Sequence, residues 1–243
     1  MKKLFPAFAA LALLVSACNK ETHGDANVHI TGNVKGFKSG KLFIKREVDT
    51  SLVNIDTIEV DGNSAFESYL KLESPEMLYL VIDRGTTESI DDNLKFFAEP
   101  GTVNIETTLD YFYSKAKITG SKNHDKYEEF KKVRARFTDE HLDLLQKNIE
   151  ATAVADVARL DSIAAAEEQN QKRRYLYTAN FALKNGKYEV APYIALSEIQ
   201  DINTKYLDTI QKGMTKKVAA SKYGRMLTKY VADRKKYEAE AVK

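Results

Sequence analysis

The sequence predicts an α+β protein in which an N-terminal antiparallel β-sandwich is followed by an α-helical domain. Three observations predict this fold class. Short runs that alternate apolar and polar residues fill residues 27–120, which is typical of strands with one buried face. After Gly120 the apolar residues recur at helical spacing instead. Parallel neighbouring strands need a long crossover connection, which is usually a helix. No helical pattern separates the short runs, so a parallel sheet is disfavoured.

Residues 1–17 have the order of a secretory signal peptide. Lys2 and Lys3 give a basic start, an uncharged apolar run covers residues 4–15, and small residues follow. This run has 12 residues, whereas a helix that crosses the hydrocarbon core of a bilayer needs about 20. We therefore expect a leader that is removed, not a transmembrane helix.

Cys18 is the only cysteine among the 243 residues, and it follows the leader directly. Residues 15–18, Val-Ser-Ala-Cys, resemble the lipobox of bacterial lipoproteins, in which the thiol is alkylated with diacylglycerol and the chain is cleaved before it. The alternative is an ordinary secretory leader followed by an incidental thiol. The position favours lipidation, so we expect Cys18 to be a membrane anchor. An Asp directly after the lipidated cysteine retains such lipoproteins at the inner membrane, and this sequence has Asn19 there. We therefore expect the protein at the outer membrane, facing either the periplasm or the outside.

Residues 18–26 contain no large apolar residue, and we interpret them as the lipidated cysteine and a flexible tether.

Charge is distributed unevenly along the chain. Residues 19–120 carry 11 Lys and Arg against 17 Asp and Glu, and residues 121–243 carry 24 against 18. The two halves could attract each other, or the basic half could face an anionic lipid surface. For an exported chain we expect no nucleic-acid partner.

The β-rich half, residues 27–120, contains about eight predicted strands. Asp61-Gly62 stands between two of them and predicts a tight turn, because Gly tolerates the positive φ that a hairpin turn requires. Several strands at this close spacing favour a sandwich. The apolar positions that define the runs are Val28, Ile30, Val34, Leu42, Ile44, Ile58, Val60, Phe66, Leu70, Leu72, Leu78, Leu80, Ile82, Val103 and Ile105.

In the second half, residues 121–243, the spacing of the apolar residues predicts four or five helices. Asn185-Gly186 is a predicted helix stop, Pro192 suits the first turn of a helix, and Gly213 interrupts the next segment. The last helix carries an apolar stripe that either packs on the protein's own core or docks a partner. The partner-docking candidates on this stripe are Tyr223, Met226, Tyr230 and Tyr237.

Short turn-and-strand motifs run through the β-rich half and one more lies near residue 220. They are residues 30–36 (ITGNVKG), 40–42 (GKL), 55–62 (IDTIEVDG), 99–103 (EPGTV), 118–121 (ITGS) and 221–227 (SKYGRML). With these motifs the chain resembles the domain-of-unknown-function family 4369. That family forms the N-terminal part of many Gram-negative lipoproteins whose C-terminal part is a thioredoxin-like thiol-disulfide oxidoreductase, and the helix before that module is similar to residues 221–227.

The resemblance implies the fold, the lipid anchor and an envelope location. The catalytic module of the longer relatives contains a Trp-Cys-x-x-Cys centre, and its reaction needs a reactive thiolate. This sequence has no Trp and one Cys, so the redox activity is not implied.

Other catalytic signatures are missing from the sequence. His23, His29, His124 and His141 lack the HExxH spacing of a zinc site, and Asp91-Asp92-Asn93 lacks the Gly and distant Glu of a calcium loop. The sequence has no GxSxG elbow, no phosphate-binding loop and no dinucleotide fingerprint. We therefore expect no enzyme activity, no metal and no cofactor.

Aromatic residues are the candidate ligand-binding groups. Tyr111, Phe112 and Tyr113 lie together at a predicted strand edge, where they either pack in the sandwich or stack on a sugar or peptide. The leading hypothesis is a lipid-anchored, non-catalytic envelope lipoprotein that acts as an interaction or binding module. The alternatives are an accessory or regulatory subunit of a thioredoxin-like envelope protein, and a surface glycan-binding lipoprotein.

Overall fold

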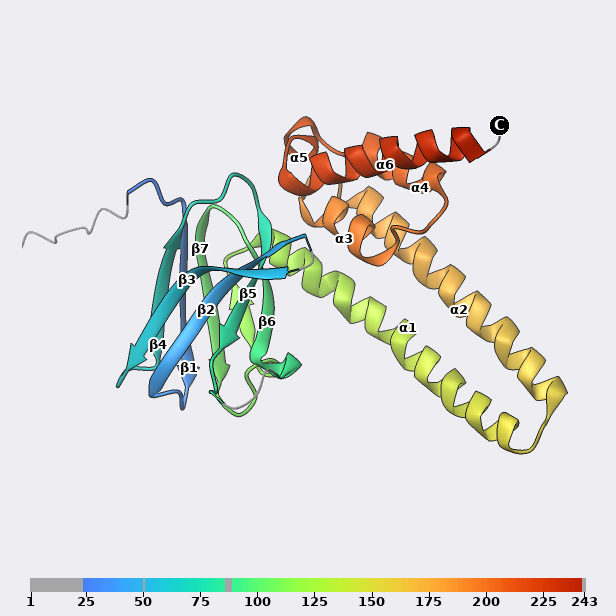
Figure 1. The fold of residues 1–243 in the computed structure, drawn as a ribbon, viewed down its shortest axis with the longest axis horizontal. Coiled ribbons are helices and arrows are strands. Elements are labelled where there is room, and N and C mark those ends of the chain that lie inside the picture. Colours follow the sequence, from blue (N-terminus) through green and yellow to red (C-terminus); the bar gives the residue numbers. More distant parts are fainter. Residues whose placement is uncertain (1–23, 50, 86–88, 242–243) are drawn as a thin grey trace, which may run out of the picture.

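The computed structural model describes residues 24–49, 51–85 and 89–241. Strands form one end of the molecule and helices the other (Figure 1). Residues 1–17 and Cys18, on which the expected leader and anchor depend, lie outside the described residues. In the described part, no helix combines the length and apolar character needed to cross a membrane.

The β-rich half is a sandwich of two four-stranded sheets, which confirms the predicted α+β class. The first sheet has the order β4-β1-β7-β8 and the second the order β3-β2-β5-β6. The strands are β1 (Val28–Lys35), β2 (Ser39–Val48), β3 (Ser51–Asp61), β4 (Ala65–Leu70), β5 (Glu76–Ile82), β6 (Asn93–Ala98), β7 (Gly101–Thr108) and β8 (Lys117–Thr119), with a 3₁₀ turn η1 (Ile90–Asp92) before β6.

One strand pair corrects the expectation of a purely antiparallel sandwich. β1 pairs in parallel with β7, with Ile30 opposite Val103, while its other neighbour β4 is antiparallel. The chain passes from β6 in the second sheet to β7 in the first through residues 99–100. After this crossover, β7 runs in the same direction as β1 and pairs with it. The chain between the two strands consists of β2–β6, so the parallel pair forms without a connecting helix.

The sandwich core lies between the sheets and follows the alternation of the sequence. In β1, every second side chain from Val28 to Val34 faces this core, except that Gly32 has no side chain to bury. Gly32 stands where a Cβ atom would lie 2.1 Å from the carbonyl oxygen of Ile105, so only glycine lets β1 and β7 approach this closely. The predicted turn at Asp61-Gly62 is confirmed, since β3 ends at Asp61 and Gly62 has a φ of 77°.

The first helix begins at Lys122, two residues after the predicted change of pattern at Gly120. Six helices occur in the described residues, one of them a single turn, against the predicted four or five. Asn185 caps the second helix, Pro192 lies in the first turn of the third and Gly213 ends the fourth, as predicted. The helices are α1 (Lys122–Ala153), α2 (Val157–Lys184), α3 (Val190–Glu198), α4 (Thr204–Gly213), α5 (Lys216–Ala219) and α6 (Lys222–Ala241).

The two longest helices form a projecting hairpin, which we call the arm. α1 has 32 residues, so it is about 48 Å long at 1.5 Å per residue. The side chain of Ser121 caps the start of α1, and that of Asp156 caps the start of α2. The shorter helices α3–α6, which we call the head, pack beside the C-terminal part of α2, and the far end of the arm extends away from the sandwich (Figure 1).

Candidate functional site

The sandwich and the helices share a hydrophobic cluster, which we call the junction core. Met77 of β5 and Phe97 of β6 point away from the sandwich core and pack against helical side chains. These include Phe130 of α1, Ile194 of α3 and Tyr223 of α6. The rings of Phe97 and Tyr223 meet edge to face with centroids 6.0 Å apart. The helical half therefore covers the outer face of the second sheet.

Buried polar groups fix the two halves to each other around this core. The backbone N–H of Met77 donates to the Tyr223 hydroxyl at 3.0 Å, and that of Phe97 donates to Nδ1 of His124 at 3.4 Å. Burial lowers the pKa of His124, which keeps the ring neutral and Nδ1 able to accept. The buried carboxylate of Glu76 pairs with Arg46 of the same sheet and with Lys222 of α6. These polar contacts hold the second sheet against α1 and α6.

A cavity of about 670 Å³ lies beside the junction core, between the second sheet and α1. We call it the junction cleft. Its volume falls within the range of about 300 to 1,000 Å³ that is typical of ligand pockets. The lining residues are Glu47, Leu52, Tyr79, Asp91, Asn93, Lys95, Tyr113, Tyr127, Lys131, Arg134 and Glu198.

Three tyrosines from separate elements line the junction cleft. Tyr79 comes from β5 and donates its hydroxyl to Glu47 at 3.2 Å, Tyr127 comes from α1, and Tyr113 comes from the turn after β7. Burial raises the pKa of Tyr79 above its usual value and that of Tyr127 to about 12. Both hydroxyls therefore stay protonated at neutral pH. Tyr113 is 47% exposed, and its side chain remains accessible to a ligand.

The charges of the junction cleft balance one another. Lys95 lies 5.2 Å from the centre of the Tyr79 ring, and Lys131 lies 5.4 Å from that of Tyr127. Arg134 places Nε 2.8 Å from a carboxylate oxygen of Glu198. Three basic and three acidic side chains line the cleft in total. Phenol rings and paired charges suit a polar ligand of low net charge, such as a peptide backbone or a sugar.

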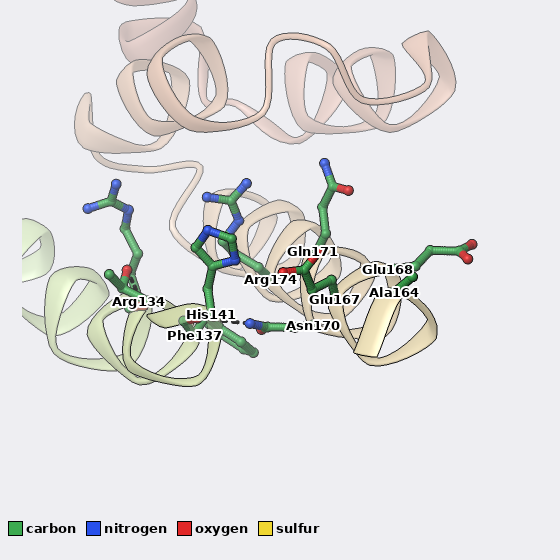
Figure 2. A pocket seen from close by; sticks show the side chains of 10 residues that line it. Arg134, Phe137, His141, Ala164, Glu167, Glu168, Asn170, Gln171 and Arg174 are labelled. Atoms are coloured by element: carbon green, nitrogen blue, oxygen red, sulfur yellow. Dashed lines mark hydrogen bonds between the residues drawn. The ribbon is translucent and has the colours of Figure 1, made fainter. Parts of the chain in front are cut away.

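A second cavity, of about 600 Å³, lies between α1 and α2, and Arg134 lines it as well. Figure 2 shows Arg134, His141 and Arg174 extending toward the same side of the arm. Asn170 joins the two helices, because its side-chain amide donates to the carbonyl of Phe137 at 2.9 Å. Its Oδ1 atom has no hydrogen-bond partner among the described residues. This cavity is polar and of mixed charge, with fewer aromatic walls than the junction cleft.

The three aromatic residues predicted as a ligand-binding cluster lie in three different environments. Tyr113 lines the junction cleft. Tyr111 is 52% exposed and lies under Lys115, whose Nζ is 3.9 Å from the ring centre, outside the cleft. Phe112 is 2% exposed and packs in the sandwich core, so its assignment to ligand binding was wrong. The turn after β7 directs the middle ring inward and the flanking rings outward.

The predicted docking stripe on α6 is divided by the structure. Tyr223 is buried in the junction core, which corrects its assignment as a docking residue. Tyr230 is half-buried and donates its hydroxyl to the carbonyl of Gln200 at 2.9 Å. Met226 and Tyr237 are exposed. The apolar stripe of this helix is wide enough that one side of it meets the protein's own core.

Sequence reasoning missed both Tyr79 and Tyr127 as site residues. A signal for Tyr79 was present, because residues 76–82 are apolar at nearly every position and all are buried. A strand without alternation is covered on both faces. That pattern indicated that a second layer covers β5.

His29, His124 and Asp92 of the acidic loop have structural partners. His29 stacks on Tyr69 at 4.2 Å, and Asp92 pairs with Arg84 at 2.5 Å. In the described ranges, no three His, Cys, Asp or Glu side chains are grouped to hold a metal ion.

Comparison with known proteins finds a family match for the N-terminal part of the chain. Residues 28–127 match the model of a family described as a domain of unknown function, DUF4369. No curated protein and no solved structure matches the chain. The matched segment covers the whole sandwich and the first residues of α1, so it includes all three tyrosines of the junction cleft.

Proposed function

We propose, on the premise that residues 28–127 form a domain of the DUF4369 family, that this protein is a lipid-anchored, non-catalytic binding module of the cell envelope. Its ligand is held in the junction cleft. The observation that carries the proposal is the convergence of an exposed tyrosine, Tyr113, a buried one, Tyr79, and a half-buried one, Tyr127, on a cavity between the two halves. Ligand pockets are frequent at such junctions.

The preorganised walls of the cleft support a binding role. Tyr79 is held by Glu47, and Arg134 by Glu198, before any ligand arrives. A ligand therefore meets side chains that have already lost their rotamer freedom, which reduces the entropic cost of binding. Tyr113 projects from a turn and supplies the accessible contact.

Arrays of peptides and glycans test the ligand site. Tyr113→Ala should weaken any binding at least tenfold, because it removes the accessible ring of the cleft. Tyr111→Ala is the matched control, since Tyr111 is equally exposed on the same turn but lies outside the cleft. Equal loss in both variants, or no binding to either array, would contradict the cleft as the ligand site.

Labelling with a palmitate analogue tests the proposed anchor at Cys18. We expect label on the wild-type chain and none on Cys18→Ser. A second control moves the thiol by combining Cys18→Ser with Ser16→Cys, and it should also remain unlabelled. Equal labelling of all three proteins would refute lipidation at this position.

Glycan capture is the second candidate, and the exposed ring of Tyr113 favours it. Phenol rings stack on the apolar faces of sugars, while the neutral hydroxyl of Tyr127 can donate to a sugar oxygen and that of Tyr79, which donates to Glu47, can accept from a sugar hydroxyl. This candidate predicts signals on the glycan array alone, and competition by the free oligosaccharide. Binding confined to peptides would exclude it.

A further inference from the structure

The far end of the arm has an exposed apolar surface that its own fold does not use. We call residues 139–168 the arm tip. Leu144, Ala151 and Ile163 bury the inner face of the hairpin. Leu142, Leu145 and Ile149, spaced as one face of α1, are all exposed, as are Val154 and Val157 where the chain turns into α2. A contiguous apolar patch of this kind on a solvent-exposed surface marks an interaction site.

The charge and position of the arm tip argue against a lipid surface as its partner. Residues 139–168 contain eight Asp and Glu against two Lys and Arg. This net charge of −6 is repelled by anionic headgroups. The arm tip also lies at the opposite end of the molecule from β1, the first strand of the sandwich (Figure 1). A basic protein surface with apolar side chains is the complementary partner.

The head of the same molecule offers such a surface. A groove of about 490 Å³ lies between α2 and α4, with Leu176, Leu183 and Tyr206 partly exposed along it and Lys205 also in its lining. The whole head, residues 190–241, contains ten Lys and Arg against six Asp and Glu. Its net charge of +4 is opposite in sign to that of the arm tip.

We infer that the arm tip of one copy docks in the α2–α4 groove of a second copy, forming a two-fold dimer. Two acidic tips repel each other, so tip-to-tip contact is disfavoured, whereas a tip and a basic head attract. A two-fold arrangement occupies both tips and both grooves and leaves no open end, which closes the assembly at two copies. The exposed apolar side chains of each surface are removed from water in the same step.

Sedimentation velocity of the full chain in detergent tests this dimer. Ile149→Asp should raise the dissociation constant at least tenfold, because it places a charge in the apolar contact. Val53→Asp is the matched control, since Val53 is an exposed valine on β3 far from both surfaces, and it should leave the constant unchanged. Raising the salt concentration should also weaken the dimer, because opposite charges are screened. Circular dichroism confirms that each variant is folded.

A mixing experiment tests the tip-to-groove geometry itself. Lys205→Glu or Tyr206→Glu damages the groove and should weaken the homodimer as Ile149→Asp does. An equimolar mixture of a tip variant and a groove variant retains one intact contact per pair, so mixed dimers should exceed either homodimer. A wild-type chain that is monomeric at all concentrations, an Ile149→Asp dimer of unchanged affinity, or a mixture without recovery would overturn the proposal.

Discussion

Neighbouring aromatic residues show how a single turn directs one ring into the core and the two beside it toward solvent. Phe112 fills the sandwich core, whereas Tyr111 and Tyr113 on either side are accessible. The carbonyl of Phe112 accepts a hydrogen bond of 2.7 Å from the hydroxyl of Thr107, which fixes the turn. An aromatic triplet in a sequence is therefore not one site.

Replacing these residues should affect stability very differently. Phe112→Ala should lower the free energy of unfolding by about 3 to 5 kcal/mol, because it leaves a cavity in a packed core. Tyr111→Ala should change it by about 0.5 kcal/mol or less, as is usual for an exposed position. Urea unfolding measures both. Similar losses for the two variants would contradict the burial assigned to Phe112.

His124 should make the protein sensitive to mild acid. Burial lowers its pKa in the folded state below the ordinary value of 6.5, so the unfolded chain binds the proton more readily. The neutral ring makes its full contribution to folding stability above pH 6.5. This contribution is lost as the pH falls through the lowered pKa of the folded state. Unfolding free energies measured between pH 7 and pH 5 should decrease.

Two substitutions identify the group responsible for that decrease. His124→Gln should flatten the pH dependence, since glutamine does not titrate. His141→Gln should leave it in place, because His141 is exposed on the arm. A slope that disappears with His141 and persists without His124 would contradict the assignment.

At the scale of the elements, the turn between α1 and α2 contains a strained residue. Ala155 has a φ of 52°, in the left-handed region that disfavours residues with a Cβ atom. Ala155→Gly should therefore stabilise the protein by about 0.5 to 1 kcal/mol. Ala158→Gly, three residues later inside α2, should destabilise it by a similar amount. Thermal unfolding of the two variants should shift the midpoint in opposite directions, and equal downward shifts would refute the strain.

Elements specified by local signals could be predicted from the sequence, and elements specified by distant contacts could not. The caps and stops at Asn185, Pro192 and Gly213 follow from backbone chemistry within a few residues. The parallel pairing of β1 with β7 joins residues more than 70 positions apart. Alternation reveals which face of a strand is buried but not which strand lies beside it.

At the scale of the whole molecule, the junction core makes the sandwich and the helices one folding unit. Met77 and Phe97 would face water if the helices separated. We expect the two halves to unfold in a single transition, with the same midpoint by far-ultraviolet circular dichroism and by tyrosine fluorescence. Phe97→Ala should lower that midpoint for both probes together. Two separate transitions in the wild type would contradict a shared core.

The candidate site was only partly predictable for the same reason as the strand pairing. Tyr113 could be proposed from its aromatic neighbours in the sequence. Tyr79 and Tyr127 become site residues only because α1 packs against β6, the neighbour of β5, which brings together positions 48 residues apart. A single sequence shows that β5 is covered on both faces, but not which helix covers it.

Photo-crosslinking in intact cells tests the central claim, that the junction cleft holds the ligand, most directly. A photoreactive phenylalanine analogue is placed at position 113 in one strain and at position 111 in another, in otherwise unchanged chains. The account predicts a discrete crosslinked product from position 113 that is absent from position 111. The same product from both positions, or none from position 113, would contradict it.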